Sequence, residues 1–384
     1  MKTTAGYRFL VAQKPERDLL RDALNESWDD DENALIDRLL QSAELEPTAR
    51  RTVQLRAGRL VSAVRARKAE QGALDAFMQE YDLSSEEGVV LMCLAEALLR
   101  IPDKETAEKL IADKLHSANW ESHLGKSTSL FVNASTWGLM LTGNMVKLGR
   151  ETRKDFRSAL KRLVNRGGEP LVRTAIRQSM RIMGYQYVMG RTIKEALERA
   201  DKKKNRNYRY SFDMLGEAAL TWPDAERYLQ AYRNGIETVG AQRRGDDIFA
   251  ATSISVKLSA LHPRYEFGQR ERVLTELTPR ILDLARLARE QDTALTMDAE
   301  EADRLLLSLD VFAEVLSHPD LAGWDGFGLA LQAYGKRAPA AIDWLADLAK
   351  RTGHRIPIRL VKGAYWDTEI KHAQVEGFTG YPVY

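Results

Sequence analysis

The sequence predicts an α/β protein: an incomplete TIM-type (β/α)8 barrel of about five β/α units, preceded by an all-α arm and helical domain. Up to about residue 205, apolar residues recur at three- and four-residue spacings, which is typical of helices. After that point short β-rich runs alternate with long helical patterns, and repeated strand–helix units imply a parallel sheet. No Gly-x-Gly-x-x-Gly follows the first strand, so a barrel is favoured over an open doubly wound sheet.

The N-terminal part contains two clear helix starts. The acidic run at 29–32 suits a helix N-terminus better than a metal site. Ser84 and Glu87 form a capping box that opens a further helix. The run at 202–207 lacks apolar periodicity and is predicted to be an exposed linker. We therefore assign residues 1–205 to the helical arm and α domain, and residues 206–384 to the first five β/α units.

Five strands are expected in the second part, at 209–215, 252–258, 294–298, 326–332 and 356–362. Crossover helices are expected between them, at 224–239, 269–291, 302–316 and 339–352. Eight units take about 250 residues, whereas roughly 180 follow the linker. We expect the sequence to stop inside the barrel, with an unpaired sheet edge after the fifth strand.

Composition excludes several classes of protein. The 57 Lys and Arg residues against 55 Asp and Glu, with 44% hydrophobic residues, are typical of a soluble protein rather than a disordered or strongly nucleic-acid-binding chain. The single cysteine, Cys93, has apolar neighbours, which predicts a packed core thiol in a reducing compartment. The longest apolar run, 89–95, is about a third of the roughly 20 residues that cross a bilayer, so any membrane contact would be peripheral.

Polar residues recur at the C-terminal ends of the predicted strands, where barrels carry their chemistry. They are Asp213, Lys257, Asp298, Gln332 and Arg359. Packing explains such a recurrence poorly, because isolated charges at core positions are costly. The two cations suit an anionic ligand, and the glutamine amide suits the edge of a heterocycle. Two aromatic residues after the fifth strand, Tyr365 and Trp366, can form walls for a planar ring.

Each of these residues also has a structural explanation. Asp298 with Glu301 fits an N-cap pair. Lys257 can extend to solvent, Gln332 can cap a turn, and Asp213 can pair with Arg359. Their shared position at the strand ends favours a site. The six histidines lack ligand spacing, so no metal site is predicted, and no Gly-x-Ser-x-Gly elbow or phosphate loop is present.

Four segments resemble the proline dehydrogenase domain of the proline utilization A flavoproteins, in the family's order: 210–219, 253–265, 297–303 and 359–366. The segment 83–100 is similar to the family's region before the barrel. The resemblance covers nearly the whole chain after about residue 20. It implies an FAD enzyme that oxidises L-proline to 1-pyrroline-5-carboxylate by hydride transfer to the flavin N5, with quinone as the electron acceptor.

The resemblance also implies residue roles. The catalytic residues would be Lys257, Asp298, Arg359 and Tyr365. Lys257 would bind the proline carboxylate, Asp298 would order polar groups around the substrate, and Arg359 would lie near the flavin N5. Tyr365 and Ala364 would line the proline ring, and Asp213 would hold a basic partner from later in the barrel. Gln332 would pair with the pyrimidine edge of the flavin. Further flavin contacts are expected from Val361, Gly363, Ala364 and Trp366.

Several parts of the family are absent from this sequence: the last barrel strands, the helix whose paired arginines grip the proline carboxylate, the aldehyde dehydrogenase module and a ribbon-helix-helix segment. The expected partners are L-proline and a quinone, with peripheral membrane contact in the full-length protein and a homo-oligomer compatible with the sequence. We expect a cytoplasmic location, compatible with the inner face of the bacterial membrane, and no nucleic-acid partner for this segment. The alternative is a non-catalytic helical interaction module or DNA-binding regulatory fragment, which the basic stretches at 150–166 and 202–206 indicate.

Overall fold

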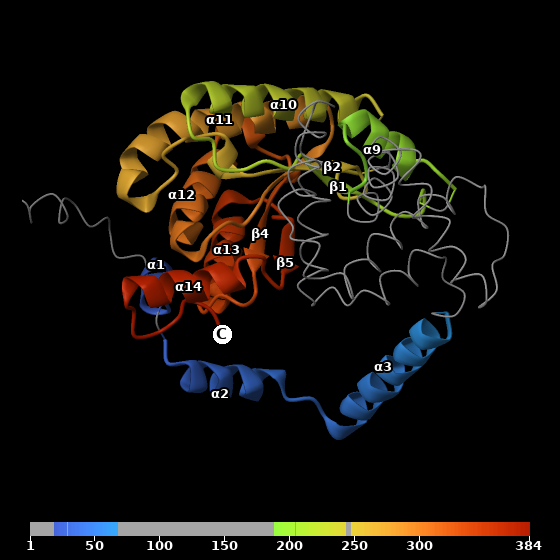
Figure 1. The fold of residues 1–384 in the computed structure, drawn as a ribbon, viewed down its shortest axis with the longest axis vertical. Coiled ribbons are helices and arrows are strands. Elements are labelled where there is room, and N and C mark those ends of the chain that lie inside the picture. The colour runs from blue at the N-terminus through green and yellow to red at the C-terminus, as the bar shows by residue number, and fades with distance from the viewer. Residues whose placement is uncertain (1–18, 29, 68–187, 204, 243–246) are drawn as a thin grey trace, which may run out of the picture. The chain divides into compact units, whose positions relative to one another are not determined.

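The computed structural model describes residues 19–28, 30–67, 188–203, 205–242 and 247–384 (Figure 1). The chain divides into two compact units, one of residues 1–45 with 197–384 and the other of residues 46–196. The predicted capping box at Ser84, the Cys93 thiol, and the stretches 83–100 and 150–166 lie outside the described residues. The domain boundary near residue 205 stays a prediction.

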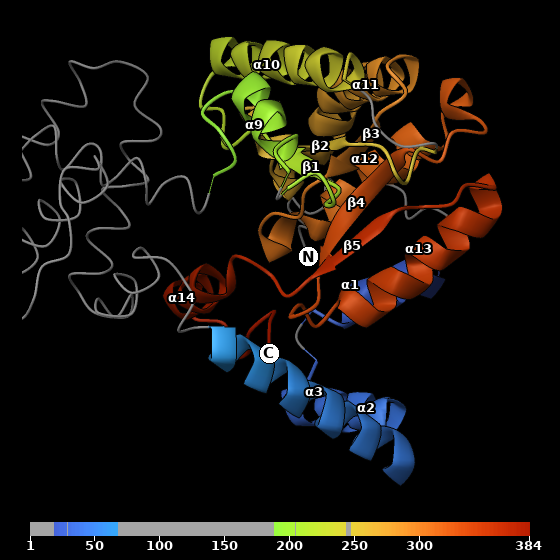
Figure 2. The same cartoon turned by 90° about the vertical axis from the view of Figure 1, so that its right-hand side faces the viewer.

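The first unit contains a parallel sheet of five described strands, paired in chain order (Figure 2). The strands are β1 (Ser211–Asp213), β2 (Ser253–Val256), β3 (Ala294–Met297), β4 (Phe327–Gln332) and β5 (Ile358–Val361). Each lies within the range predicted for it. Parallel neighbours in chain order are the winding of a barrel, and the predicted fold class, helices before an incomplete TIM-type barrel, is confirmed.

A helix follows each strand: α10 (Trp222–Gly240), α11 (Arg270–Glu290), α12 (Leu305–Leu316), α13 (Ala338–Thr352) and α14 (Trp366–Glu376). The start of α10 is a capping box, in which Thr221 and Asp224 each accept the other's backbone N–H. The end of α13 is Gly353, whose φ of 72° favours glycine. Helix α12 begins later than predicted because residues 302–304 form a 3₁₀ turn.

The core lies between the sheet and these helices. Ile254, Leu295 and Phe327 of the strands are fully buried, and the Phe327 ring stacks on Phe312 of α12 with ring centroids 4.9 Å apart. Burial of side chains of this size contributes about 1.5–3 kcal/mol each. Strand β5 differs, because Leu360 is 59% exposed and Val361 38% exposed. The sheet is therefore well covered from β2 to β4 and exposes apolar side chains at β5.

Two N-terminal helices belong to the same unit, α1 (Leu19–Glu26) and α2 (Glu32–Ala43). Helix α1 packs against α13, and Arg21 of α1 forms an ion pair with Asp310 of α12 at 2.7 Å. Helix α2 begins where the acidic run predicts, since the Asp31 carboxylate accepts the Ala34 N–H at 2.9 Å.

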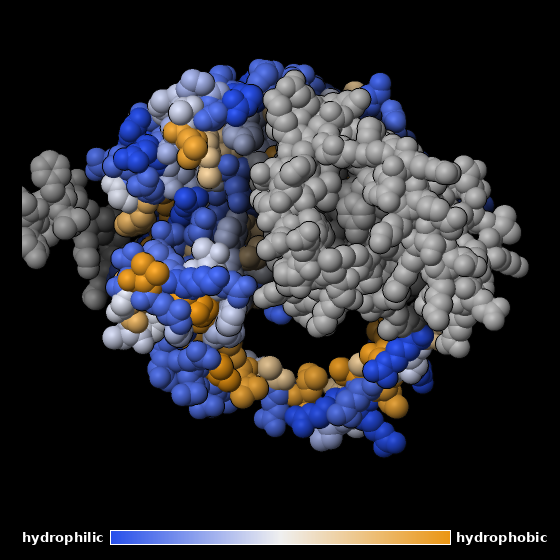
Figure 3. Space-filling model, in the orientation of Figure 1, coloured by the Kyte–Doolittle hydropathy of each residue, from blue (hydrophilic) through white to orange (hydrophobic). Residues whose placement is uncertain are grey.

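The second unit contributes α3 (Pro47–Arg67), and the division between the units falls within α9 (Ile193–Ala200). Helix α3 has exposed apolar side chains, which appear orange among its polar ones in Figure 3: Val53, Leu55, Leu60, Val61 and Val64. The predicted linker forms turns with mostly exposed residues where it is described. Within the described part of the chain, no helix is both long enough and apolar enough to cross a membrane.

Candidate active site

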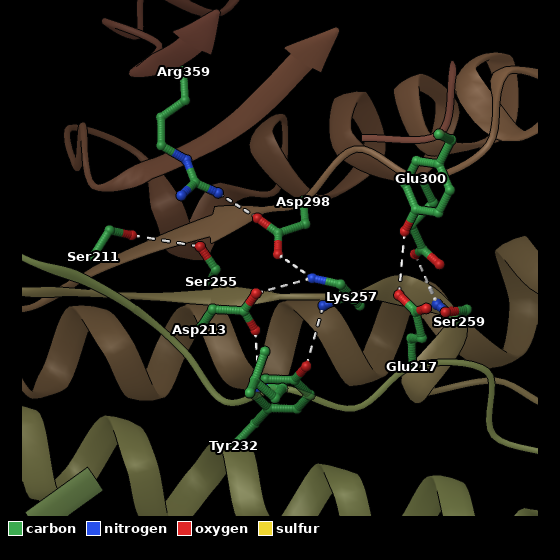
Figure 4. A network of polar contacts seen from close by, with 12 residues as sticks. Ser211, Asp213, Glu217, Tyr232, Ser255, Lys257, Ser259, Asp298, Glu300 and Arg359 are labelled. Carbon is green, nitrogen blue, oxygen red and sulfur yellow. Dashed lines mark hydrogen bonds and ion pairs between the residues drawn. The ribbon is translucent and has the colours of Figure 1, made fainter. Parts of the chain in front are cut away.

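Four charged side chains form one chain of ion pairs at the C-terminal ends of the strands (Figure 4). The Lys257 ammonium, just after β2, lies 3.1 Å from Asp213 Oδ2 of β1 and 2.8 Å from Asp298 Oδ2 after β3. The other oxygen of Asp298 accepts from Nη2 of Arg359 on β5. Four of the five polar residues predicted at the strand ends therefore contact one another directly.

The two ends of this ion-pair chain are more exposed to solvent than its middle. The side chains of Lys257 and Asp298 are 15% and 11% exposed, whereas those of Asp213 and Arg359 are more than a third exposed. Burial alone would lower the pKa of Lys257, but the ion pairs with Asp298 and Asp213 outweigh it and raise that pKa above its usual value. Lys257 is therefore a cation at neutral pH.

The charges and donors of the ion-pair chain limit what it can bind. Two carboxylates and two cations leave it formally neutral, which suits a zwitterion better than a bare anion or cation. The Lys257 ammonium has three N–H donors, of which two are used by Asp213 and Asp298. One donor of Lys257 remains for a ligand.

The geometry bears on three of the structural explanations of these residues. Asp298 is not an N-cap, because the following 3₁₀ turn begins after Glu301 and has no side-chain cap. Lys257 does not extend to solvent, and Asp213 pairs with Lys257 instead of Arg359. The basic group that contacts Asp213 in this structure is Lys257, just after β2. A basic partner of Asp213 from later in the barrel stays a prediction.

A buried tyrosine that sequence reasoning missed lies beneath Lys257. Tyr232 of α10 is 2% exposed, and its hydroxyl accepts the Lys257 backbone N–H at 3.3 Å. Burial raises the pKa of Tyr232, so the phenol stays protonated. An aromatic residue on the apolar face of a helix indicates only core packing, so no sequence signal marks this contact.

Glu300 connects the loops that follow β1, β2 and β3, whereas its place in the sequence suggests only a helix start. Its side chain is buried and accepts the Ser259 N–H at 3.0 Å, and it pairs with Arg304 at 3.2 Å. Burial raises the pKa of Glu300. The Ser259 hydroxyl in turn accepts the Ala218 N–H at 3.0 Å. The three loops are therefore joined through one buried carboxyl group.

The loop after β1 reaches the segment after β5. Leu215, Gly216 and Ala218 have positive φ angles in this loop, and the Tyr365 hydroxyl donates to Glu217 Oε2 at 3.2 Å. Burial and the nearby Glu217 raise the pKa of Tyr365. Sequence reasoning missed Glu217, which carries no signal apart from its place in the first resembling segment.

Gln332 ends β4 and contacts the segment after β5. Its Oε1 accepts the Tyr334 hydroxyl at 2.9 Å and the Ala364 N–H at 3.0 Å, while its Nε2 donates to the Glu300 carbonyl at 2.8 Å. Gly363 has a φ of 129°, and a Cβ there would overlap the Tyr334 ring. The predicted Gln332 thus lies at the same end of the sheet as the ion pairs, held by the neighbouring loops.

The residues that the resemblance assigns to a flavin fit a flat, conjugated ligand. The Nε atom of Arg359 is buried and has no hydrogen-bond partner among the described residues. Ala364 is exposed, and Val361 and Trp366 are 38% and 47% exposed. An unpartnered donor on β5, followed along the chain by exposed apolar and aromatic side chains, supplies groups of the kind that line the site of such a ring.

A small cavity lies behind Gln332, lined by Trp28, Tyr265 and Arg337 among others. Its volume of about 40 Å³ has room for one or two waters but not for an organic ligand. Among the described residues, no group of three or more His, Cys, Asp or Glu side chains is arranged to hold a metal ion. The strand-end residues are the candidate site that the ion pairs described above support.

Comparison with known families divides the chain into three matches. Residues 196–384 match the family described as proline dehydrogenase, residues 73–187 match the DNA-binding domain of proline dehydrogenase, and residues 18–65 match the proline utilization A proline dehydrogenase N-terminal domain. The second match is at odds with the expectation that this segment has no nucleic-acid partner.

Relatives of the chain are bifunctional PutA proteins. That of Salmonella typhimurium is 48% identical over 367 residues, which are 95% of this chain and 28% of the relative. That of Rhizobium meliloti is 47% identical over 350 residues, 91% of this chain and 28% of the relative. The chain thus spans 28% of the length of these curated relatives.

Solved structures of the same kind resemble the fold. A crystal structure of bifunctional proline utilization A matches with a TM-score of 0.66 at 48% identity, covering 93% of this chain and 35% of that one. A mutant of proline utilization A from Bradyrhizobium japonicum matches with a TM-score of 0.65 over the same shares of both chains.

Proposed function

Because the chain belongs to the proline dehydrogenase family, in its proline utilization A branch, we propose that its barrel oxidises L-proline to 1-pyrroline-5-carboxylate in the full-length protein. The observation that carries this proposal is the neutral chain of ion pairs formed by Asp213, Lys257, Asp298 and Arg359. Proline is an amino acid with a carboxylate and a ring nitrogen, so its binding needs cationic and anionic groups together. The ion-pair chain offers both at the C-terminal end of the sheet.

Each charged side chain then has a distinct task. The remaining N–H donor of Lys257 binds the substrate carboxylate, and Asp213 and Asp298 hold that ammonium from two sides. Asp298 also holds Arg359, so one carboxylate fixes the two cations relative to each other. Tyr365 and Ala364 line the proline ring.

We propose FAD as the cofactor. When bound, FAD would accept the hydride from the carbon next to the proline nitrogen and pass the electrons to a quinone. Arg359 would stabilise negative charge at this position, and its unpartnered Nε supports that assignment. The other side chains and backbone groups that would hold the cofactor are Gln332, Val361, Gly363, Ala364 and Trp366.

The test uses the full-length protein that contains this chain. We expect the purified protein to carry FAD and to reduce a quinone analogue only when L-proline is added. A protein that retains FAD but does not oxidise proline would contradict the proposal. D-proline serves as the control substrate, because the carboxylate of the mirror-image molecule cannot reach Lys257 while the ring keeps the same orientation.

We also propose a second activity, DNA binding by residues 73–187, which the family match supports. The basic stretch at 150–166 lies in this range and supplies the charge that phosphates require. We expect the full-length protein to shift a labelled DNA duplex in a gel, with an affinity that falls as salt is raised. Absence of a shift at low salt would contradict this activity without affecting proline oxidation.

A further inference from the structure

The amide of Gln332 is fixed in one orientation by groups whose roles cannot change. The Ala364 backbone N–H can only donate, and it points at Oε1 at 3.0 Å. The Glu300 backbone carbonyl can only accept, and it receives Nε2 at 2.8 Å. A flipped amide would place oxygen against oxygen and N–H against N–H, so the two contacts select the same orientation.

Tyr334 adds a third contact with an equally defined direction. Its hydroxyl oxygen accepts the Tyr365 backbone N–H at 2.9 Å, and its proton goes to Gln332 Oε1 at 2.9 Å. The two hydrogen bonds run in one direction, from Tyr365 through Tyr334 to Gln332. Consecutive hydrogen bonds of this kind polarise and strengthen each other. Tyr334 is 7% exposed and its ring lies against Gly363, so packing restricts the position of the ring.

A count of donors and acceptors shows what Gln332 can still offer. Both acceptor positions of Oε1 are used, by Tyr334 and Ala364, and one of the two Nε2 hydrogens is used by Glu300. Only a hydrogen-bond donor remains. Without Tyr334, one acceptor position of Oε1 would be free and the amide would be held by two contacts in place of three.

We propose that Tyr334 is a positioning residue that locks the Gln332 amide, so that Gln332 presents an N–H donor and no acceptor to the bound heterocycle. The inference rests on the proposed function, which places the flavin pyrimidine edge at Gln332. That edge carries both carbonyl acceptors and an N–H donor, so the lock selects a ring carbonyl as the group that Gln332 recognises.

The test compares Tyr334→Phe with Tyr384→Phe in the full-length protein. The Tyr384 hydroxyl donates to the Ala333 carbonyl at 3.0 Å, next to the same strand end, and contacts neither Gln332 nor Tyr365. Flavin is removed from each variant. FAD is then added, and its binding is measured by the quenching of flavin fluorescence. We expect Tyr334→Phe to weaken FAD binding roughly ten-fold, as the loss of one buried hydrogen bond does, and Tyr384→Phe to leave it unchanged.

A second readout tests the lock itself. FAD analogues in which sulfur replaces one ring carbonyl oxygen, at the 2- or the 4-position, are weaker acceptors. We expect the wild-type protein to discriminate against one of them and Tyr334→Phe to discriminate less, since Oε1 of Gln332 then offers a free acceptor position beside the Nε2 donor. The lock would be overturned if wild type bound FAD and both analogues equally, or if Tyr334→Phe and Tyr384→Phe bound FAD and the analogues alike. Neither result would contradict FAD binding or proline oxidation. A wild-type protein that binds no FAD would overturn the proposed function and the lock together.

Discussion

At the scale of single residues, Asp298 determines how the charges of the site are arranged. One carboxylate holds Lys257 with one oxygen and Arg359 with the other, and its side chain is only 11% exposed. Charged groups in such surroundings interact more strongly than at a free surface. The two cations therefore keep a fixed separation, and a ligand that touches one of them is oriented with respect to the other.

Replacement of Lys257 by Met should remove the group that we propose binds the substrate carboxylate. The loss of one charge-assisted hydrogen bond, about 1.5–3 kcal/mol, predicts a fall in kcat/KM for proline of roughly 10- to 100-fold. Lys350→Met, on an exposed position of α13, is the matched control and should leave kcat/KM unchanged. Equal kinetics for the two variants in a steady-state assay of the full-length protein would show that Lys257 does not bind substrate.

Replacement of Glu300 by Gln should change how stability depends on pH. Burial raises the pKa of Glu300 above its usual value of 4.5, so the folded protein loses stability as pH rises from that value to the raised one. The glutamine side chain keeps an oxygen for the Ser259 N–H and cannot ionise. In urea unfolding, the free energy of unfolding of Glu300→Gln should therefore increase relative to wild type as pH rises from about 4 to about 7. A constant difference across that range would contradict the raised pKa.

At the scale of elements, the N-terminal helices are attached to the barrel through the start of α13. The Arg337 guanidinium lies 4.3 Å from the centre of the Trp28 ring, and the Lys336 ammonium donates to the Asp30 carbonyl at 2.7 Å. Burial and the nearby Arg21 lower the pKa of Arg337 to about 10, so it is still a cation at neutral pH. The stacking of Arg337 on Trp28 is therefore a cation–π contact.

Trp28→Ala should loosen α1 from α13. A partly desolvated cation–π pair contributes about 0.5–2 kcal/mol, so amide hydrogen exchange in α1 should accelerate roughly two- to thirty-fold. Phe249→Ala removes a similar pair, with Arg355 at 4.3 Å from that ring, and should leave exchange in α1 unchanged. Acceleration by both variants would indicate a general loss of stability instead of a local contact.

The elements could be predicted from the sequence better than the contacts between them. Strands such as β4 are short apolar runs between turns, and Asp31 is a recognisable cap, so local pattern suffices for them. The common edge of Asp213, Lys257 and Asp298 also followed from strand order. Their pairing did not, because it depends on side-chain reach between strands that are about 40 residues apart along the chain. The hydroxyl of Tyr232 gave no pattern at all, since a buried aromatic residue suits any core.

At the scale of the whole molecule, the strand that carries one residue of the described site, β5, also carries exposed apolar side chains. The strand that carries Arg359 also exposes Leu360 and Val361, and the chain spans 28% of its curated relatives. Proline oxidation is therefore a property to test in the full-length protein. The ion pairs of Asp213, Lys257, Asp298 and Arg359 are the part of the proposed site that this chain supplies.

The most direct test is to mix the full-length protein with L-proline under anaerobic conditions and to record the absorption of its bound flavin. We predict that proline bleaches the oxidised-flavin band, and that Arg359→Met retains flavin but bleaches roughly 100-fold more slowly, because a preorganised donor to developing negative charge is lost. A wild-type flavin that stays oxidised in excess proline, or an Arg359→Met variant that bleaches at the wild-type rate, would contradict the account.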